Sequence, residues 1–128
     1  MALHITVKER AGYLYCVQLK GSIDNESYQD LGKSFGPITH EKTRAVCLDM
    51  QQVDYVSSAG MSTLVTERKA LQKSNAVFAM AGLQPQVRKV FDMTRLSPLF
   101  TLLNAVSEID ACLDPLSGQH LNTSKNMA

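Results

Sequence analysis

The amino-acid sequence predicts an α/β fold: a single domain with a mixed sheet of about five strands, a parallel centre and helices packed against the sheet. Two observations lead to this prediction. Short apolar runs typical of strands alternate along the chain with segments whose apolar residues recur every three or four positions, as in helices. The chain has 128 residues, 45% of them hydrophobic, which suits one core. The expected order, β-β-α-β-α-β-α-β-α, implies right-handed crossovers between parallel strands.

The first predicted unit is an antiparallel hairpin. Residues 5–9 alternate apolar and polar side chains, residues 13–20 are rich in β-forming side chains, and Ala11-Gly12 supplies a turn between them. The segment Gly21-Ser22-Ile23-Asp24 is expected to end the second strand, because it interrupts the run of β-forming residues.

A short helix is predicted next. Asp24 or Asn25 can cap its N-terminus, and Gly36-Pro37 ends it. The apolar residues between these limits follow the i, i+3, i+7 spacing of one helix face: Tyr28, Leu31 and Phe35.

The middle of the chain predicts a buried strand followed by a second helix. Residues 45–50 form a nearly continuous apolar run, as expected of a strand covered on both faces, so this strand belongs in the centre of the sheet. The second helix follows a double serine, Ser57-Ser58, and turns one apolar side inward. That side consists of Met61, Leu64, Val65 and Leu71.

The alternation of strands and helices continues to residue 113. Residues 77–81 and 99–103 predict two more strands; Pro85 begins the helix between them, and Asn104 caps the last helix. The apolar faces of these helices are Val87, Val90 and Phe91 in the first and Val106, Ile109 and Leu113 in the second. We therefore place the domain at residues 1–113. Residues 114–128 are too polar to offset their ordering entropy and are expected to form a flexible tail.

Composition and charge exclude several classes of function. The formal net charge is +1, and the 13 basic residues are scattered among 12 acidic ones, so no basic surface for nucleic acid is expected. No segment has the length and apolar character of a membrane span, and the N-terminus lacks the apolar core of a signal peptide. We expect a soluble, cytoplasmic protein.

No metal site is expected. The cysteines are three in number, far apart and set in apolar runs, which indicates reduced, buried thiols: Cys16, Cys47 and Cys112. The carboxylates most expected at strand ends could form an acidic cluster that holds a divalent cation: Asp24, Asp49 and Asp54. Capping by Asp24 and solvation of Asp54 explain these residues individually, and we favour that interpretation.

The double serine is the most informative feature of the sequence. It lies where an apolar strand passes into an amphipathic helix, so a hydroxyl there is exposed next to free backbone N–H groups and the positive end of the helix dipole. Ser57 or Ser58 is therefore a candidate phosphoryl acceptor. Either serine can equally be an ordinary N-cap, and the motif alone does not decide between these roles.

Catalytic and nucleotide-binding roles lack a motif. A serine hydrolase elbow usually reads Gly-x-Ser-x-Gly, and the segment 56–60 has only the later glycine. No histidine is clearly placed near the serines, although an approach by His40 stays open. Neither glycine-rich phosphate-binding loop is present. We expect a protein that is not an enzyme and needs no cofactor.

Three segments together resemble the STAS domains of the anti-sigma factor antagonist family, also called anti-anti-sigma factors. Residues 19–24, Leu-Lys-Gly-Ser-Ile-Asp, resemble the family segment that closes the second strand. Residues 48–61, which contain Leu-Asp-Met, Val, Tyr and Ser-Ser-Ala-Gly-Met, resemble the central signature. Ala81-Gly82-Leu83 and the apolar and threonine positions up to Leu96 resemble the third-helix pattern. The resemblance covers roughly residues 3–113.

The resemblance implies a partner-switching regulator. It implies that Ser58 is phosphorylated by a partner that is both anti-sigma factor and serine kinase, and that a PP2C-type phosphatase removes the phosphate. Ser57 stands where the family often has aspartate, which leaves it a second possible acceptor. Asp24 is implied to contact the kinase or its metal-bound nucleotide. The partner-binding residues carried over are Asp24, Ser57, Ser58, Ala59, Gly60 and Met61.

Other functions share the same fold. A small STAS subunit of a lipid-transport ABC complex is also a short solitary domain, and other STAS domains serve as interaction modules. A nucleotide-binding domain is the weakest alternative, because no motif supports it.

Overall fold

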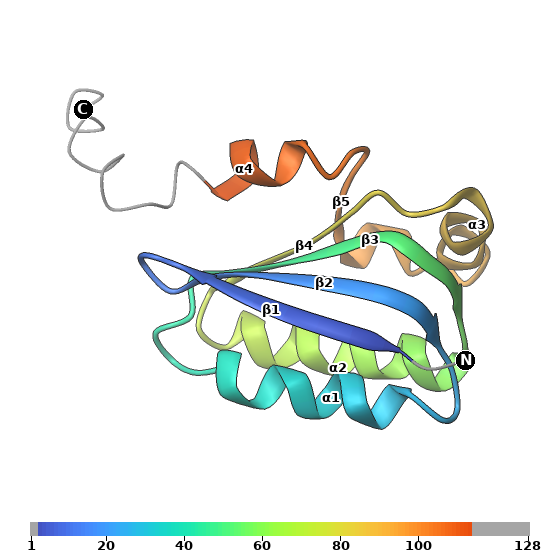
Figure 1. Ribbon diagram of the computed structural model, residues 1–128, viewed down its shortest axis with the longest axis horizontal. Coiled ribbons are helices and arrows are strands. Elements are labelled where there is room, and N and C mark those ends of the chain that lie inside the picture. Colours follow the sequence, from blue (N-terminus) through green and yellow to red (C-terminus); the bar gives the residue numbers. More distant parts are fainter. Residues whose placement is uncertain (1–2, 114–128) are drawn as a thin grey trace.

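The computed structural model describes residues 3–113, which form a five-stranded sheet with helices on both faces (Figure 1). The strands are β1 (His4–Arg10), β2 (Leu14–Ile23), β3 (Ala45–Val56), β4 (Val77–Ala81) and β5 (Thr101–Leu103), in that order across the sheet. β1 and β2 are antiparallel and the other neighbours are parallel. The predicted mixed sheet with a parallel centre is confirmed, and β3 is its middle strand.

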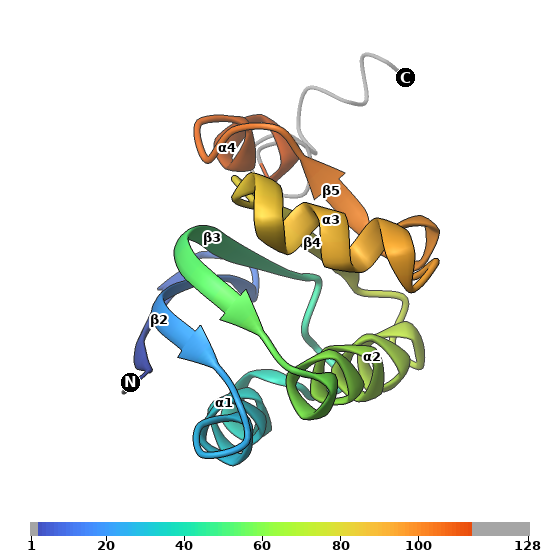
Figure 2. The ribbon, with the colours of Figure 1, turned by 90° about the vertical axis from the view of Figure 1, so that its right-hand side faces the viewer.

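The helices cover the two faces unequally. α1 (Tyr28–Phe35) and α2 (Ser58–Gln72) lie side by side on one face, and α4 (Glu108–Leu113) lies on the other (Figures 1 and 2). α3 (Pro85–Met93) contributes Val87 and Phe91 to the same large core as α1 and α2. The smaller core beneath α4 is built on small strand residues such as Ala45, Cys47 and Ala79.

Both central strands are longer than the sequence predicts. β2 continues past Gly21 to Ile23, and β3 continues past Met50 to Val56. The glycine does not end β2: the register with β3 shifts between Gln18 and Lys20 and again between Gly21 and Ser22, and Gly21 has a positive φ of 121°. Such an irregularity bends a strand without ending its pairing, and glycine tolerates the required backbone angle.

The last strand and helix differ from the prediction. Residues Ser97–Leu99 form a 3-10 turn, η2, so β5 starts only at Thr101. α4 begins at Glu108, because backbone bonds from Glu108 to Ala105 and from Ile109 to Val106 make a turn before it. Asn104 is therefore not its cap. The predicted tail, residues 114–128, lies outside the described residues.

The three cysteines, distant in sequence, gather on the α4 face. Cys16 and Cys47 are partners on neighbouring strands, and Cys112 of α4 packs against the same small core. All three are free; Cys47 is buried, as expected, whereas Cys16 and Cys112 are only half-buried. Burial raises the pKa of the Cys47 thiol to about 12, so this side chain stays protonated near neutral pH.

Candidate functional site

The two adjacent serines have different environments. Ser57 is the N-cap of α2: its backbone is extended, with φ −81° and ψ 173°, and its Oγ accepts a hydrogen bond from the Gly60 N–H at 3.1 Å. Its side chain is buried, with 7% of the residue exposed. The Ser57 hydroxyl thus satisfies one of the free N–H groups at the start of the helix.

Ser58 is the first residue of α2 and is exposed. Its side chain makes no hydrogen bond to any other residue within 3–113. Because Ser57 provides the cap, the Ser58 hydroxyl is left at the surface beside the positive end of the helix dipole. Of the two serines that the sequence singles out, Ser58 is the accessible one.

A close contact between β2 and α2 fixes the position of Ser58. The Ser57 N–H donates to the Ile23 carbonyl at 2.8 Å, at the end of β2. A Cβ atom added to Gly60 would lie 2.6 Å from Cγ2 and 3.0 Å from the carbonyl oxygen of Ile23. Any larger residue would force Ile23 or α2 to shift, so the first turn of α2 lies directly against β2.

Asp24 follows Ile23 and therefore lies next to this contact. Its Oδ1 accepts hydrogen bonds from the backbone N–H groups of Glu26 at 2.9 Å and Ser27 at 3.1 Å. The bond from Glu26 is the main reason that the pKa of Asp24 lies below its usual range, so the carboxylate is ionised at neutral pH. The side chain of Ser27 donates to the Ser22 carbonyl at 2.7 Å and completes this turn.

The prediction that Asp24 or Asn25 caps α1 is wrong in detail. α1 begins at Tyr28, and its N-cap residue is Ser27, whose side chain makes no capping bond. Asp24 instead closes the turn that precedes the helix, and its carbonyl accepts from the Tyr28 N–H at 3.0 Å. A β2 strand that runs on to Ile23 moves the start of α1 along the chain.

The remaining residues expected to bind a partner are less exposed. Ala59 is half-buried, Gly60 is buried against Ile23, and Met61 is 6% exposed and belongs to the large core. Ser58 is thus the most exposed residue of the predicted segment 57–61, and the residues around it are partly or fully buried. Tyr55, near the end of β3, is 53% exposed and is not among the partner-binding residues expected from the sequence.

A groove between α1 and α2 begins beside Ser58. Its volume is about 380 Å³, and its lining includes Gly32 of α1 and Ala59, Ser62 and Glu67 of α2. Sequence reasoning missed this groove, because it depends on how closely the two helices pack. The only signal was the lack of a side chain at Gly32.

His40 does not approach the serines. Its Nε2 lies 3.1 Å from the Tyr15 hydroxyl, and its ring meets the ring of Tyr13 edge-on. Tyr13 directly precedes β2 and Tyr15 is its second residue, whereas Ser57 is bonded to the end of the same ten-residue strand. His40 is therefore at the other end of β2 from Ser57 and is not placed to act as a base for Ser58.

The three carboxylates do not form a cluster. Asp49 accepts from the backbone of Gln51 at 3.1 Å, Asp54 accepts from the Ser22 hydroxyl at 2.7 Å, and Asp24 is used in its own turn. Among residues 3–113, no group of three or more histidine, cysteine or acidic residues could hold a metal ion. No helix in the same range is long and apolar enough to cross a bilayer.

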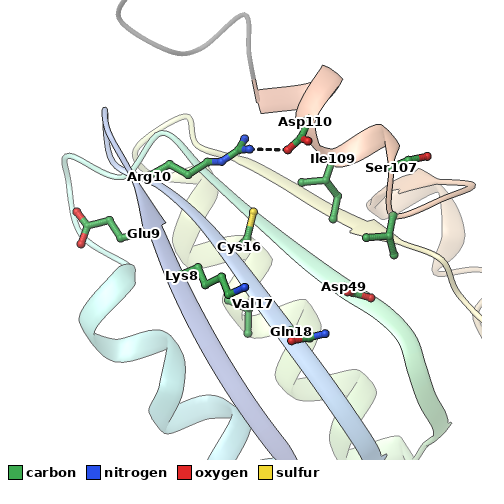
Figure 3. A pocket seen from close by; sticks show the side chains of 11 residues that line it. Lys8, Glu9, Arg10, Cys16, Val17, Gln18, Asp49, Ser107, Ile109 and Asp110 are labelled. Atoms are coloured by element: carbon green, nitrogen blue, oxygen red, sulfur yellow. Dashed lines mark hydrogen bonds and ion pairs between the residues drawn. The ribbon is translucent and has the colours of Figure 1, made fainter.

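A second pocket lies on the opposite face of the sheet. Its volume is about 540 Å³, and it is bounded by β1, β2 and α4 (Figure 3). Arg10 of β1 and Asp110 of α4 form an ion pair at its rim, and Lys8 and Cys16 point into it. No residue of α2 lines this pocket, so it is separate from the Ser58 surface.

Comparisons with known proteins find a family model and curated relatives that match this chain. The STAS domain family model matches residues 4–109. BtrV of Bordetella bronchiseptica, named as a candidate anti-sigma factor antagonist, is 26% identical over 87 residues, 68% of this chain and 75% of BtrV. The anti-sigma-B factor antagonist of Staphylococcus aureus is 25% identical over 85 residues, 66% of this chain and 79% of that protein.

Solved structures show the same fold. The anti-sigma factor antagonist SpoIIAA in its unphosphorylated form superposes with a TM-score of 0.72 over 85% of this chain and 96% of SpoIIAA, at 14% identity. The phosphorylated form of SpoIIAA, from Bacillus, gives a TM-score of 0.67, again at 14% identity. At such identities the likeness concerns the fold alone.

Proposed function

The chain belongs to the STAS domain family, with anti-sigma factor antagonists among its relatives, and from this premise we propose that it is a partner-switching regulator controlled by phosphorylation of Ser58. Unmodified protein binds an anti-sigma factor that is also a serine kinase and so releases the kinase's client. Phosphorylation by that kinase ends the binding. A PP2C-type phosphatase restores the unmodified form, and the whole cycle takes place in the cytoplasm.

The exposed hydroxyl of Ser58 is the observation that carries this proposal. A phosphate there adds about −1.5 to −2 charge and three acceptor oxygens at a helix N-terminus, where an anion is favoured. Because Ser57 makes the capping bond, the modification at Ser58 leaves that bond in place. The fold is therefore expected to survive phosphorylation.

The effect of the phosphate falls on the outer surface. A partner that packs over Ser58 must bury the phosphate, and burying such a charge without a matched cation costs several kcal/mol. Since about 1.4 kcal/mol corresponds to a tenfold change in affinity, an interface centred on Ser58 is lost.

Asp24 and Ser57 have supporting roles in this proposal. Asp24 is an ionised carboxylate next to the contact between β2 and α2, and we assign it to binding the kinase or its metal-bound nucleotide. Ser57 positions Ser58 through its cap. Its buried, hydrogen-bonded Oγ makes it the second choice as acceptor.

Affinity purification from the native cell, with mass spectrometry of partners and of modified serines, tests the proposal. We expect a serine kinase, a phosphatase and a phosphate on Ser58. Recovery of an ATPase and a permease would instead identify a lipid-transport subunit.

The recovered kinase then allows a direct binding measurement. Ser58→Ala should bind it as tightly as the unmodified wild type, whereas Ser58→Asp should bind at least tenfold more weakly, about 1.4 kcal/mol. Equal binding by all three proteins would contradict the proposed switch.

A further inference from the structure

The groove between α1 and α2 holds a carboxylate without a cation. Glu67 of α2 lies in the groove wall and is half-buried. Within residues 3–113, its side chain forms neither a hydrogen bond nor an ion pair. Desolvation by the groove wall raises the pKa of Glu67.

The neighbouring basic residues do not supply that cation. No lysine or arginine lines the groove, where Tyr28 and Glu67 are the ionisable residues. Arg68, next to Glu67 in the sequence, donates from Nε to the Leu99 carbonyl and from Nη1 to the Gln72 side chain. Its guanidinium is thus engaged away from the groove.

The groove is kept open by small residues. Gly32 has no side chain, and a Cβ atom added there would lie 3.8 Å from Cγ2 of Thr63, an ordinary contact. The Thr63 hydroxyl donates to the Ala59 carbonyl at 3.0 Å, so Thr63 satisfies its own polar group and turns its methyl group towards α1. The groove therefore has a largely apolar floor with a carboxylate near one end.

Ser58 does not line the groove, but the next residue, Ala59, does. Ser58 and Ser62 are four residues apart on α2 and so lie on one side of the helix, and Ser62 lines the groove. From Ser58 to Glu67 the helix rises about 13 Å at its rise of about 1.5 Å per residue. Because nine residues of a helix with about 3.6 residues per turn make about two and a half rotations, Glu67 lies on the other side of α2 from Ser58, and a partner reaches both only by covering the N-terminal end of α2 as well as the groove.

From these contacts we infer that the α1–α2 groove receives a segment of the anti-sigma partner bearing a lysine or arginine, and that Glu67 binds this cation. The inference rests on the proposed function, because it takes the Ser58 surface as the docking site. Ser58 and Glu67 are about 13 Å apart along the axis of α2, so a phosphate on Ser58 does not contact this ion pair. Glu67 then selects which partner binds, whereas Ser58 controls when it binds.

Charge variants of Glu67 test the inference with the purified kinase as the probe. Glu67→Gln should weaken binding about fivefold, and Glu67→Lys should weaken it further through repulsion. Wild-type affinity should also fall more steeply with salt than that of Glu67→Gln. Glu41→Gln, which changes an exposed carboxylate outside the groove, is the matched control and should bind as the wild type does.

A second variant tests the groove without changing its charge. Gly32→Gln places a long side chain in the groove and replaces glycine in a helix by a better helix former. We expect a melting temperature equal to or above that of the wild type, together with at least a tenfold loss of affinity. Higher stability with weaker binding excludes misfolding as the cause.

The outcomes separate this inference from the proposed switch. If Glu67→Gln and Gly32→Gln bind normally while Ser58→Asp does not, the groove inference is overturned and the switch stands. If the two groove variants bind weakly while Ser58→Asp binds normally, the groove stands and the switch fails. If no lysine or arginine to glutamate change in the kinase restores binding to Glu67→Lys, the cation assignment is wrong.

Discussion

The two faces of the sheet differ in how firmly they are covered. On one face, α1, α2 and α3 share a large core in which Phe35, Phe78, Phe100 and Phe91 form a chain of edge-to-face contacts, with ring centroids 5.6 to 5.9 Å apart. On the other face, the six-residue helix α4 rests on small strand residues, and the exposed Arg10–Asp110 ion pair joins it to β1.

This difference shows which face is suited to a binding switch. Ser58 and the α1–α2 groove lie on the face with the larger core, so a docking partner meets a surface whose position is set by extensive packing. α4 has few buried residues, which is typical of segments that open locally. Phosphorylation of Ser58 changes only the outer surface of the protein, so it acts best on a face whose underlying structure is held in place by a large core.

Truncation of one buried residue on each face gives the largest expected difference. Phe91→Ala should lower the free energy of unfolding by about 3–5 kcal/mol, because it leaves a cavity in the aromatic chain. Ile109→Ala should release α4 locally and cost about half as much or less. Urea denaturation measures both values, and equal losses would remove the distinction between the faces.

On the face covered by α1, α2 and α3, the contact between Gly60 and Ile23 should give the next largest loss of stability after the core residues. Gly60→Ala forces a Cβ atom to within 2.6 Å of Ile23, and we expect a loss of about 1–3 kcal/mol from the resulting shift. Gly32→Ala is the matched control, since its nearest neighbour is 3.8 Å away. It should raise stability by about 0.5–1 kcal/mol, as alanine does for glycine in a helix. Thermal unfolding of the Gly60→Ala and Gly32→Ala variants measures both effects. Equal changes in stability would show that the close contact with Ile23 does not set the cost at Gly60.

Alanine substitutions of the two adjacent serines should differ in their effect on the free energy of unfolding. Ser57→Ala removes the N-cap of α2 and should cost about 1 kcal/mol of stability. Ser58→Ala should change stability by less than about 0.5 kcal/mol, because its side chain is exposed. A Ser58→Ala loss as large as that of Ser57→Ala, measured by chemical denaturation, would contradict the division of roles.

The smallest expected effect is on the acid side of the stability profile. Because hydrogen bonds hold the folded-state pKa of Asp24 below its usual value, Asp24 stabilises the fold above the pKa of the unfolded chain, about 4. That contribution is lost as the pH falls through the lower folded-state pKa. Melting temperatures of wild type and Asp24→Asn should therefore differ at neutral pH and converge in acid. A difference that does not depend on pH would show that the turn does not need the charge.

Much of the fold could be predicted because local pattern and tertiary contact agree. The apolar runs at 45–50 and 77–81 lie within central strands, and Pro85 begins α3 as its fixed backbone angle favours. The ends of strands were less predictable where hydrogen bonding to a neighbouring strand outweighs the conformational preference of the local residues. β2 passes through Gly21 because its neighbour β3 continues alongside, and no local signal at Gly21 records that neighbour.

The sequence by itself determined the α/β class, the order of the elements and the double serine at the start of α2, because these follow from periodicity and capping chemistry over short stretches. Tertiary structure alone decided that Ser57 is the cap and Ser58 the exposed hydroxyl, since this depends on the bond from Ser57 to Ile23 and on Gly60 packing against β2. It also decided that Glu67 faces a groove without a cation. The roles of Ser57, Ser58 and Glu67 depend on contacts between segments that are distant in the chain, so the spacing of residues within one segment does not predict them.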